Sequence, residues 1–263
     1  MNNMFSISFK IFLMNYHKRP IPKSLVDVLL QFTEIHHHIE NKKTFIERVI
    51  KPHTAGNLIL FYGESDQLVG YTRIYQHQLE IKSNLITIFS AKTYSNPTHN
   101  TLYAGARLGL THTMKYKLAH PEEELVHFSS VTTPYKYQFL SHLSNTVYPR
   151  PHVEVPKHIL VLVNFLKEAN DWSSSETHPM LIHDGLQRKL PLTLESIPEP
   201  TVADYFDSLN SEINLGFSLL VCIPLNLCNI SYGIRKILML SSPVMQPSEQ
   251  ESRHSSTAVE VDP

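Results

Sequence analysis

The stretch from Asn57 to Ser130 constrains the fold most, because short β-forming runs alternate there with polar turns. Branched and aromatic residues are dense in four segments of it, and such runs are typical of strands. The polar residues 63–67 between the first two segments predict a hairpin turn. We therefore expect strands at 58–62, 68–76, 85–91 and 125–131.

A long helix is expected between the third and fourth of these strands, at about 98–118. Its apolar residues recur at helical spacing, at Leu102, Ala106, Leu110 and Met114. Gly105 and Gly109 are four residues apart and share one face of that helix. Glycine weakens a helix, so two on one face predict close packing against the sheet. The last two strands should then be neighbours, joined by a helical crossover.

The remaining segments complete an α/β fold with a mixed, mostly antiparallel central sheet flanked by helices. Helical patterns occupy 24–39 and 45–50 before the first strand, and 154–168 after the last, while Pro134 begins a further helix. A short strand is expected at 179–183 and helical turns at 202–209. We expect an N-terminal extension at 1–20, a single domain at 21–240 and a disordered tail at 241–263.

Residues Leu215 to Ile234 form the most apolar part of the chain and contain no charge. The segment is long enough to span a bilayer. Pro224, Asn226 and Gly233 interrupt it, however, and favour a buried strand at 215–223 followed by a helix at 225–240. A membrane-associated protein anchored at 215–234 is the alternative.

Composition excludes several classes of function. The net charge of −1 gives no bulk attraction to nucleic acid. Cys222 and Cys228 are too few for a disulfide framework or a zinc site, and we expect both to be small buried side chains in a cytoplasmic protein. The adjacent His36, His37 and His38 point in different directions on a helix, so no metal site is predicted.

The hairpin from Tyr62 to Tyr71 resembles the second and third strands of the GNAT superfamily of N-acetyltransferases. That family has a strand, a short acidic turn and a strand that opens with an apolar-Gly-aromatic step, here Val69-Gly70-Tyr71. The order of the following strand, helix and strand is also similar, and the resemblance covers about residues 21–145. It implies a GNAT-like fold and transfer of an acyl group from acetyl-CoA or another acyl-CoA to a small-molecule or protein amine.

The chain departs from the family where the cofactor's pyrophosphate would bind. The family has a glycine-rich loop at the start of the long helix, whereas residues 95–101 lack glycine and Pro97 removes one N–H donor. By resemblance, Thr98, His99 and Asn100 could still hold an anion there. The backbone of Ile88, Phe89 and Ser90 would bind the pantetheine arm.

The resemblance also implies catalytic residues. His127 would be the general base, with Glu80 as the alternative, and Tyr135 or Tyr137 would protonate the leaving thiolate. Each has a structural interpretation too, because a strand histidine or a tyrosine at a helix start is more often a packing residue. A non-catalytic binding module with the same fold therefore stays open beside the enzyme.

Overall fold

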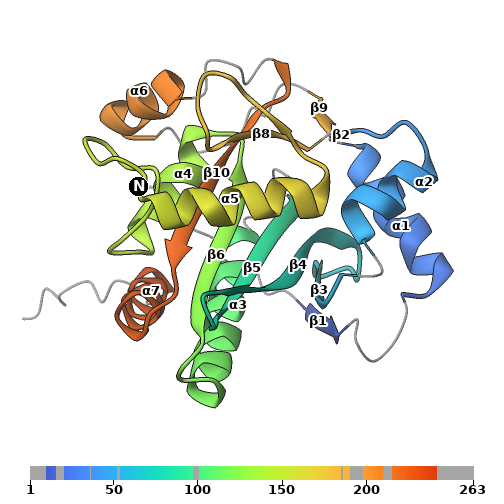
Figure 1. The fold of residues 1–263 in the computed structure, drawn as a ribbon. Helices are drawn as coiled ribbons and strands as arrows, with labels where there is room; N and C mark the ends of the chain where they lie inside the picture. Colours follow the sequence, from blue (N-terminus) through green and yellow to red (C-terminus); the bar gives the residue numbers. More distant parts are fainter. Residues whose placement is uncertain are drawn as a thin grey trace, which may run out of the picture.

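The computed structural model describes residues 10–15, 21–35, 37–51, 54–96, 101–184, 186–189, 198–209 and 215–241. Within them, an eight-stranded sheet has the order β1-β3-β4-β5-β6-β10-β8-β7. Neighbouring strands are antiparallel except β5 and β6, which are parallel. The predicted class, a mixed and mostly antiparallel sheet flanked by helices, is confirmed (Figure 1).

The four predicted central strands are present in the predicted order. They are β3 (Gly56–Tyr62), β4 (Leu68–Ile81), β5 (Asn84–Ser95) and β6 (Glu124–Val131). The helix α3 (Thr101–Ala119) joins the last two of them. The expected pairing of the third strand with the fourth is confirmed, since Ile86 to Ala91 pair with Glu124 to Ser129.

The N-terminal region contributes a strand that the sequence did not predict. Residues 10–15, which we expected to be part of an extension, form β1 (Lys10–Asn15) and pair with β3. The first helix, α1 (Lys23–Glu34), is shorter than expected, because β2 (His37–His38) pairs with β9 (Gln187–Arg188). The second helix is present as α2 (Lys42–Phe45), followed by the π-helical turn η1 (Ile46–Ile50).

The C-terminal half completes the sheet and adds four helices within the described ranges. In chain order its elements are α4 (Pro134–His142), α5 (Lys157–Asn170), β7 (Ser173–Ser174), β8 (Leu181–His183), β9, α6 (Pro200–Leu209), β10 (Ser218–Pro224) and α7 (Leu227–Ser241).

The apolar stretch at 215–234 resolves into a strand and part of a helix, as the interrupting residues predicted. The strand β10 lies between β6 and β8, and most of its side chains are buried. Among the described residues, no helix combines the length and the apolar character needed to cross a bilayer. Of the two cysteines, Cys222 is buried as expected, but Cys228 is exposed at the start of α7.

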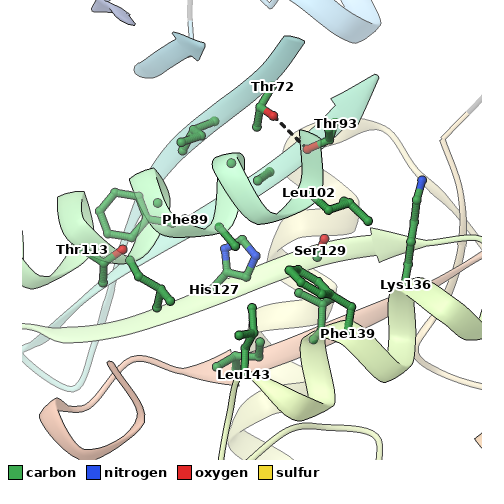
Figure 2. A pocket seen from close by; sticks show the side chains of 18 of the residues that line it. Thr72, Phe89, Thr93, Leu102, Thr113, His127, Ser129, Lys136, Phe139 and Leu143 are labelled. Carbon is green, nitrogen blue, oxygen red and sulfur yellow. Dashed lines mark hydrogen bonds between the residues drawn. The ribbon is translucent and has the colours of Figure 1, made fainter. Parts of the chain in front are cut away.

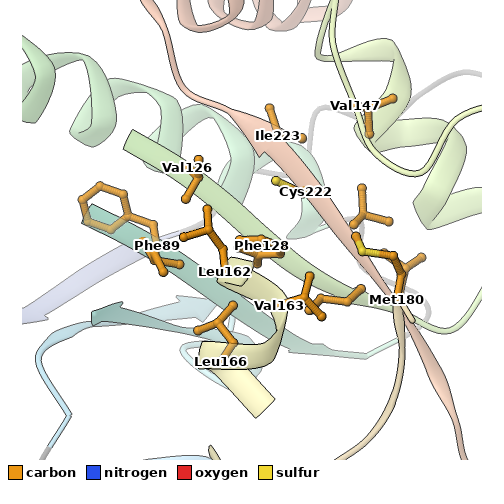
Figure 3. Close-up of a cluster of buried hydrophobic side chains, with 14 of the residues drawn as sticks. Phe89, Val126, Phe128, Val147, Leu162, Val163, Leu166, Met180, Cys222 and Ile223 are labelled. Carbon is orange, nitrogen blue, oxygen red and sulfur yellow. The ribbon is translucent and has the colours of Figure 1, made fainter. Parts of the chain in front are cut away.

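The two faces of the sheet are covered differently. On one face, α5 packs against the sheet through buried residues such as Leu162, Val163 and Leu166 (Figure 3). On the same face, α1 and α2 cover β3 and β4 in a second cluster that includes Leu58 and Tyr71. The helix α3 lies on the opposite face, and this is the face that carries the candidate site (Figure 1).

Candidate functional site

The parallel strands β5 and β6 stop pairing before either strand ends. Their pairing stops at Ala91 and Ser129. Beyond this point β5 continues to Ser95, paired with β4, and β6 continues to Val131, paired with β10. Within the described part of the chain, residues 92–95 of β5 and 130–131 of β6 pair with a neighbouring strand on one side only. A separation inside a continuous sheet presents backbone N–H and C=O groups to a ligand that lies between the strands.

A cavity of about 160 Å³ lies against the sheet at this separation. Its floor includes Ala91 and Thr93 of β5 and Ser129 and Ser130 of β6, so it adjoins the point where the strands diverge. Thr72 and Thr93 share a hydrogen bond of 2.9 Å across β4 and β5 at one edge of the floor (Figure 2). Of the 23 lining residues, 14 are apolar or glycine and nine are polar or charged, and Figure 2 shows side chains of both kinds.

Three helices form the roof of the cavity. The helices α3, α4 and α7 pack on one another through Phe139, Leu143 and Ile237, with Leu102 and Leu110 beside them. At the far end of α3, Tyr116 contacts the ring of Phe89 and its hydroxyl donates to Glu123 at 3.1 Å. The roof helices therefore pack on one another, and α3 also contacts the sheet at one end, through Tyr116. The cavity lies beneath the middle of α3.

The two glycines of α3 have different surroundings. A Cβ atom built on Gly105 would lie 3.5 Å from Oγ1 of Thr72 and 3.7 Å from Cζ of Phe61, which is ordinary packing distance. A Cβ atom on Gly109 would meet nothing within 4 Å, and Gly109 lines the cavity. Gly105 packs on the sheet as predicted, but Gly109 does not, and we correct that prediction: it faces the cavity.

His127 is the titratable group at the centre of the floor. It lies on β6 beside Phe89 of β5, and its ring points toward α3 (Figure 2). Burial lowers its pKa to about 4, and a backbone hydrogen bond with Phe89 only partly opposes this. The imidazole is therefore uncharged at neutral pH. The uncharged ring can hydrogen-bond to a ligand, but it is a weak base.

The lowered pKa of His127 predicts that acid destabilises the folded protein. Substitution of His127 should remove this contribution. The unfolded state binds a proton at His127 near pH 6.5 and the folded state only near pH 4, so stability is full above pH 6.5 and falls as the pH drops toward 4. Between pH 7 and pH 4, the wild type should lose about 3 kcal/mol more free energy of unfolding than His127→Gln. Urea denaturation at each pH measures this difference. Exposed His158 provides the control, because His158→Gln should keep the wild-type dependence.

The other predicted catalytic residues do not join His127 in the cavity lining. Tyr137 is 3 % exposed, and its hydroxyl donates to the carbonyl of Pro149 at 2.8 Å. Tyr135 is half-buried in the first turn of α4, beside Tyr103. Glu80 is exposed near the distant end of β4, where it pairs with Leu85. The sequence-based grouping of these residues is therefore not reproduced around the cavity.

The predicted backbone contacts lie slightly off the separation. Ile88, Phe89 and Ser90 belong to the part of β5 that pairs with β6, so the strand edge at the separation is formed instead by residues 92–95. Phe89 does line the cavity through its side chain. The predicted anion-binding residues Thr98, His99 and Asn100 lie outside the described residues.

Sequence reasoning missed Thr93, Ser129, Ser130 and Lys136, which line the cavity. Lys136 is in the first turn of α4, and its ammonium group extends at one side of the cavity (Figure 2). No residue pattern marks these positions, because they are defined by where two strands stop pairing. Within the described residues, no group of three or more His, Cys, Asp or Glu side chains could hold a metal ion.

Comparison with known proteins gives no family assignment. No protein-family model matches the chain, and no curated protein matches it. Two solved structures are similar at a low level, both of engineered variants of the BH1408 protein from Bacillus halodurans. A tetramutant is 14% identical, with a TM-score of 0.33, over 56% of this chain and 99% of that chain. A single-site mutant is 15% identical, with a TM-score of 0.32, over 56% and 98% of the two chains.

Proposed function

We propose that the chain binds an acyl-CoA between the diverging ends of β5 and β6 and transfers its acyl group to an amine. The observation that carries the proposal is the end of the β5–β6 ladder at Ala91 and Ser129, with both strands continuing. The amide groups of a pantetheine arm can hydrogen-bond to strand edges of this kind, as an added strand does. The order of strands around the crossover helix also agrees with the resemblance of the hairpin to GNAT acyltransferases.

The reaction joins an amine nitrogen to the thioester carbonyl carbon and breaks the carbon–sulfur bond. The amine gives up a proton, and the departing CoA thiolate takes one, so the products are an amide and CoA with a free thiol. The thioester would lie near Ala91 and Ser129, where the cavity adjoins the separated strands. Uncharged His127, on the same floor, would hydrogen-bond to the reacting group.

A second function, ligand binding without acyl transfer, is favoured by two observations: the low pKa of His127 and the hydrogen bond that already occupies the hydroxyl of Tyr137. His127 has a pKa near 4 and so takes a proton from an ammonium ion poorly. The hydroxyl of Tyr137, one of the two tyrosines expected to protonate the thiolate, already donates to Pro149. A binding module would keep the separation of the strands and the cavity but would not need either group as an acid or base.

Two measurements test the proposal and separate these functions. Acetyl-CoA at millimolar concentration should raise the melting temperature of the protein, because a ligand that binds only the folded state stabilises it. Release of free thiol from acyl-CoA in the presence of a panel of amines should then exceed the rate without protein. A thermal shift without thiol release supports the binding module. Absence of both with every acyl-CoA contradicts the proposal.

A further inference from the structure

We infer that the cavity beneath α3 holds an aliphatic acyl chain of about six carbons, so that the acyl donor is a medium-chain thioester rather than acetyl-CoA. This inference rests on the proposed function, because the cavity is taken as an extension of the thioester site. It specifies the substrate class, which the separation of β5 and β6 alone does not.

The first argument is size. The cavity measures about 160 Å³. An apolar protein cavity of about 150 Å³ is large enough to bind benzene, a six-carbon molecule. The methyl group of an acetyl thioester would leave most of this space without contacts, whereas a hexanoyl chain has a similar number of carbons to benzene.

The second argument is the chemistry of the lining. The roof contributes apolar side chains from two helices, Leu102 and Leu110 of α3 and Phe139 of α4, together with Leu143 just beyond α4. The floor adds Phe89 and Ile223. A lining of this kind favours hydrocarbon over the polar parts of CoA, because transfer of apolar surface out of water stabilises the bound state.

The third argument is continuity with the reacting position. Ala91 and Ser129 end the β5–β6 ladder, and both also line the cavity. A thioester held at the separation would therefore have its carbonyl at the rim of the floor, with the chain directed beneath the middle of α3. Gly109 leaves room at that position, since a Cβ atom there would meet nothing within 4 Å.

Chain length should therefore control affinity. Calorimetric titration with acetyl-, butyryl-, hexanoyl- and dodecanoyl-CoA should give a dissociation constant that falls up to about fourfold per added methylene. The decrease should stop near six carbons, where the cavity is full. Equal affinity for acetyl- and hexanoyl-CoA overturns the inference while leaving the proposed function intact. If no acyl-CoA of any length binds, the proposed function fails and the inference fails with it.

Filling the cavity should abolish the chain-length effect selectively. Gly109→Leu should lose most of the preference for hexanoyl-CoA over acetyl-CoA. Ala106→Leu, at a second position in the lining, tests the same space independently. Thr111→Leu is the matched control, because Thr111 is exposed on the same helix, and it should keep the wild-type preference. Retention of the preference in both cavity variants contradicts the inference.

Gly109 also allows a stability prediction that requires no ligand. Gly109→Ala should raise the melting temperature by a few degrees, because alanine favours a helix over glycine and its Cβ atom meets open space. Thermal unfolding followed by circular dichroism measures the shift. A fall in melting temperature would mean that the space beside Gly109 is closed in solution.

Discussion

Replacing Arg73 by methionine should lower the free energy of unfolding by about 4 kcal/mol, one of the two largest effects we expect from a single substitution. Arg73 is 0 % exposed on β4, and its guanidinium donates to backbone carbonyls from several segments. Its partners include Ile50 at 3.1 Å and Thr54 at 2.7 Å, together with Asn57, Lys51 and Ile74. Without the guanidinium, these buried acceptors lose a charged donor, and each loss costs about 1–3 kcal/mol where no water replaces it.

Urea denaturation followed by circular dichroism measures the effect of Arg73→Met. Arg73→Lys retains the charge and three donors, so its loss of stability should be smaller. Arg107→Met is the matched control, because Arg107 is exposed on α3 and its replacement should change stability by less than about 0.5 kcal/mol. A loss below about 1 kcal/mol for Arg73→Met would show that Arg73 does not hold the end of η1 against the sheet.

Gly56→Ala should lower the free energy of unfolding by about 3 kcal/mol. Gly56 begins β3 with φ of +135°, a conformation that residues with a side chain rarely adopt. A Cβ atom there would lie 2.0 Å from the carbonyl oxygen of Ile74 and 2.8 Å from Nη1 of Arg73. The backbone contact cannot be relieved by a side-chain rotation, so β3 and β4 would have to move apart locally.

The same denaturation experiment compares Gly56→Ala with Gly109→Ala, which places an identical methyl group in open space. The two substitutions should change stability in opposite directions. If Gly56→Ala were neutral, the close approach of β3 to β4 at Ile74 would not exist in solution.

The central part of the fold could be predicted because its strand signals are local and strong. Residues 85–91 and 125–131 are continuous β-forming runs, and the helical spacing of Leu102, Ala106 and Leu110 lies between them. A parallel pair needs a crossover of this length, so the pairing follows from the order of the segments. The buried strand β10 was predictable for a related reason, since Pro224 ends its apolar run.

The edges of the fold could not be predicted in the same way. The strand β1 forms because β3 offers it a partner, as the pairing of Leu13 with Ile59 illustrates, and no turn joins the two strands. The two residues of β2 pair with β9, about 150 positions away in the sequence, so local pattern predicts neither. Both are set by tertiary contacts that outweigh local preference.

The candidate site was predictable only in outline. The family resemblance pointed to His127 on its strand, and the structure has this residue on the cavity floor. The role of Gly109 was not predictable from the sequence. Two glycines on one helix face suggest close packing against the sheet, but the same pattern occurs here with a cavity opposite one of them. Tyr137 was a reasonable candidate by position in α4, but the bond of its hydroxyl to Pro149 depends on where the chain returns after the helix.

Amide hydrogen exchange in the presence of hexanoyl-CoA tests the central claim, that the diverging ends of β5 and β6 receive the ligand. Binding there should slow exchange within residues 92–95 and 129–131, at those amides that face the separation. Amides of β3, which lies on the other side of β4, should be unchanged. Unchanged exchange at both strand ends under saturating ligand, or protection confined to another surface, would contradict the account.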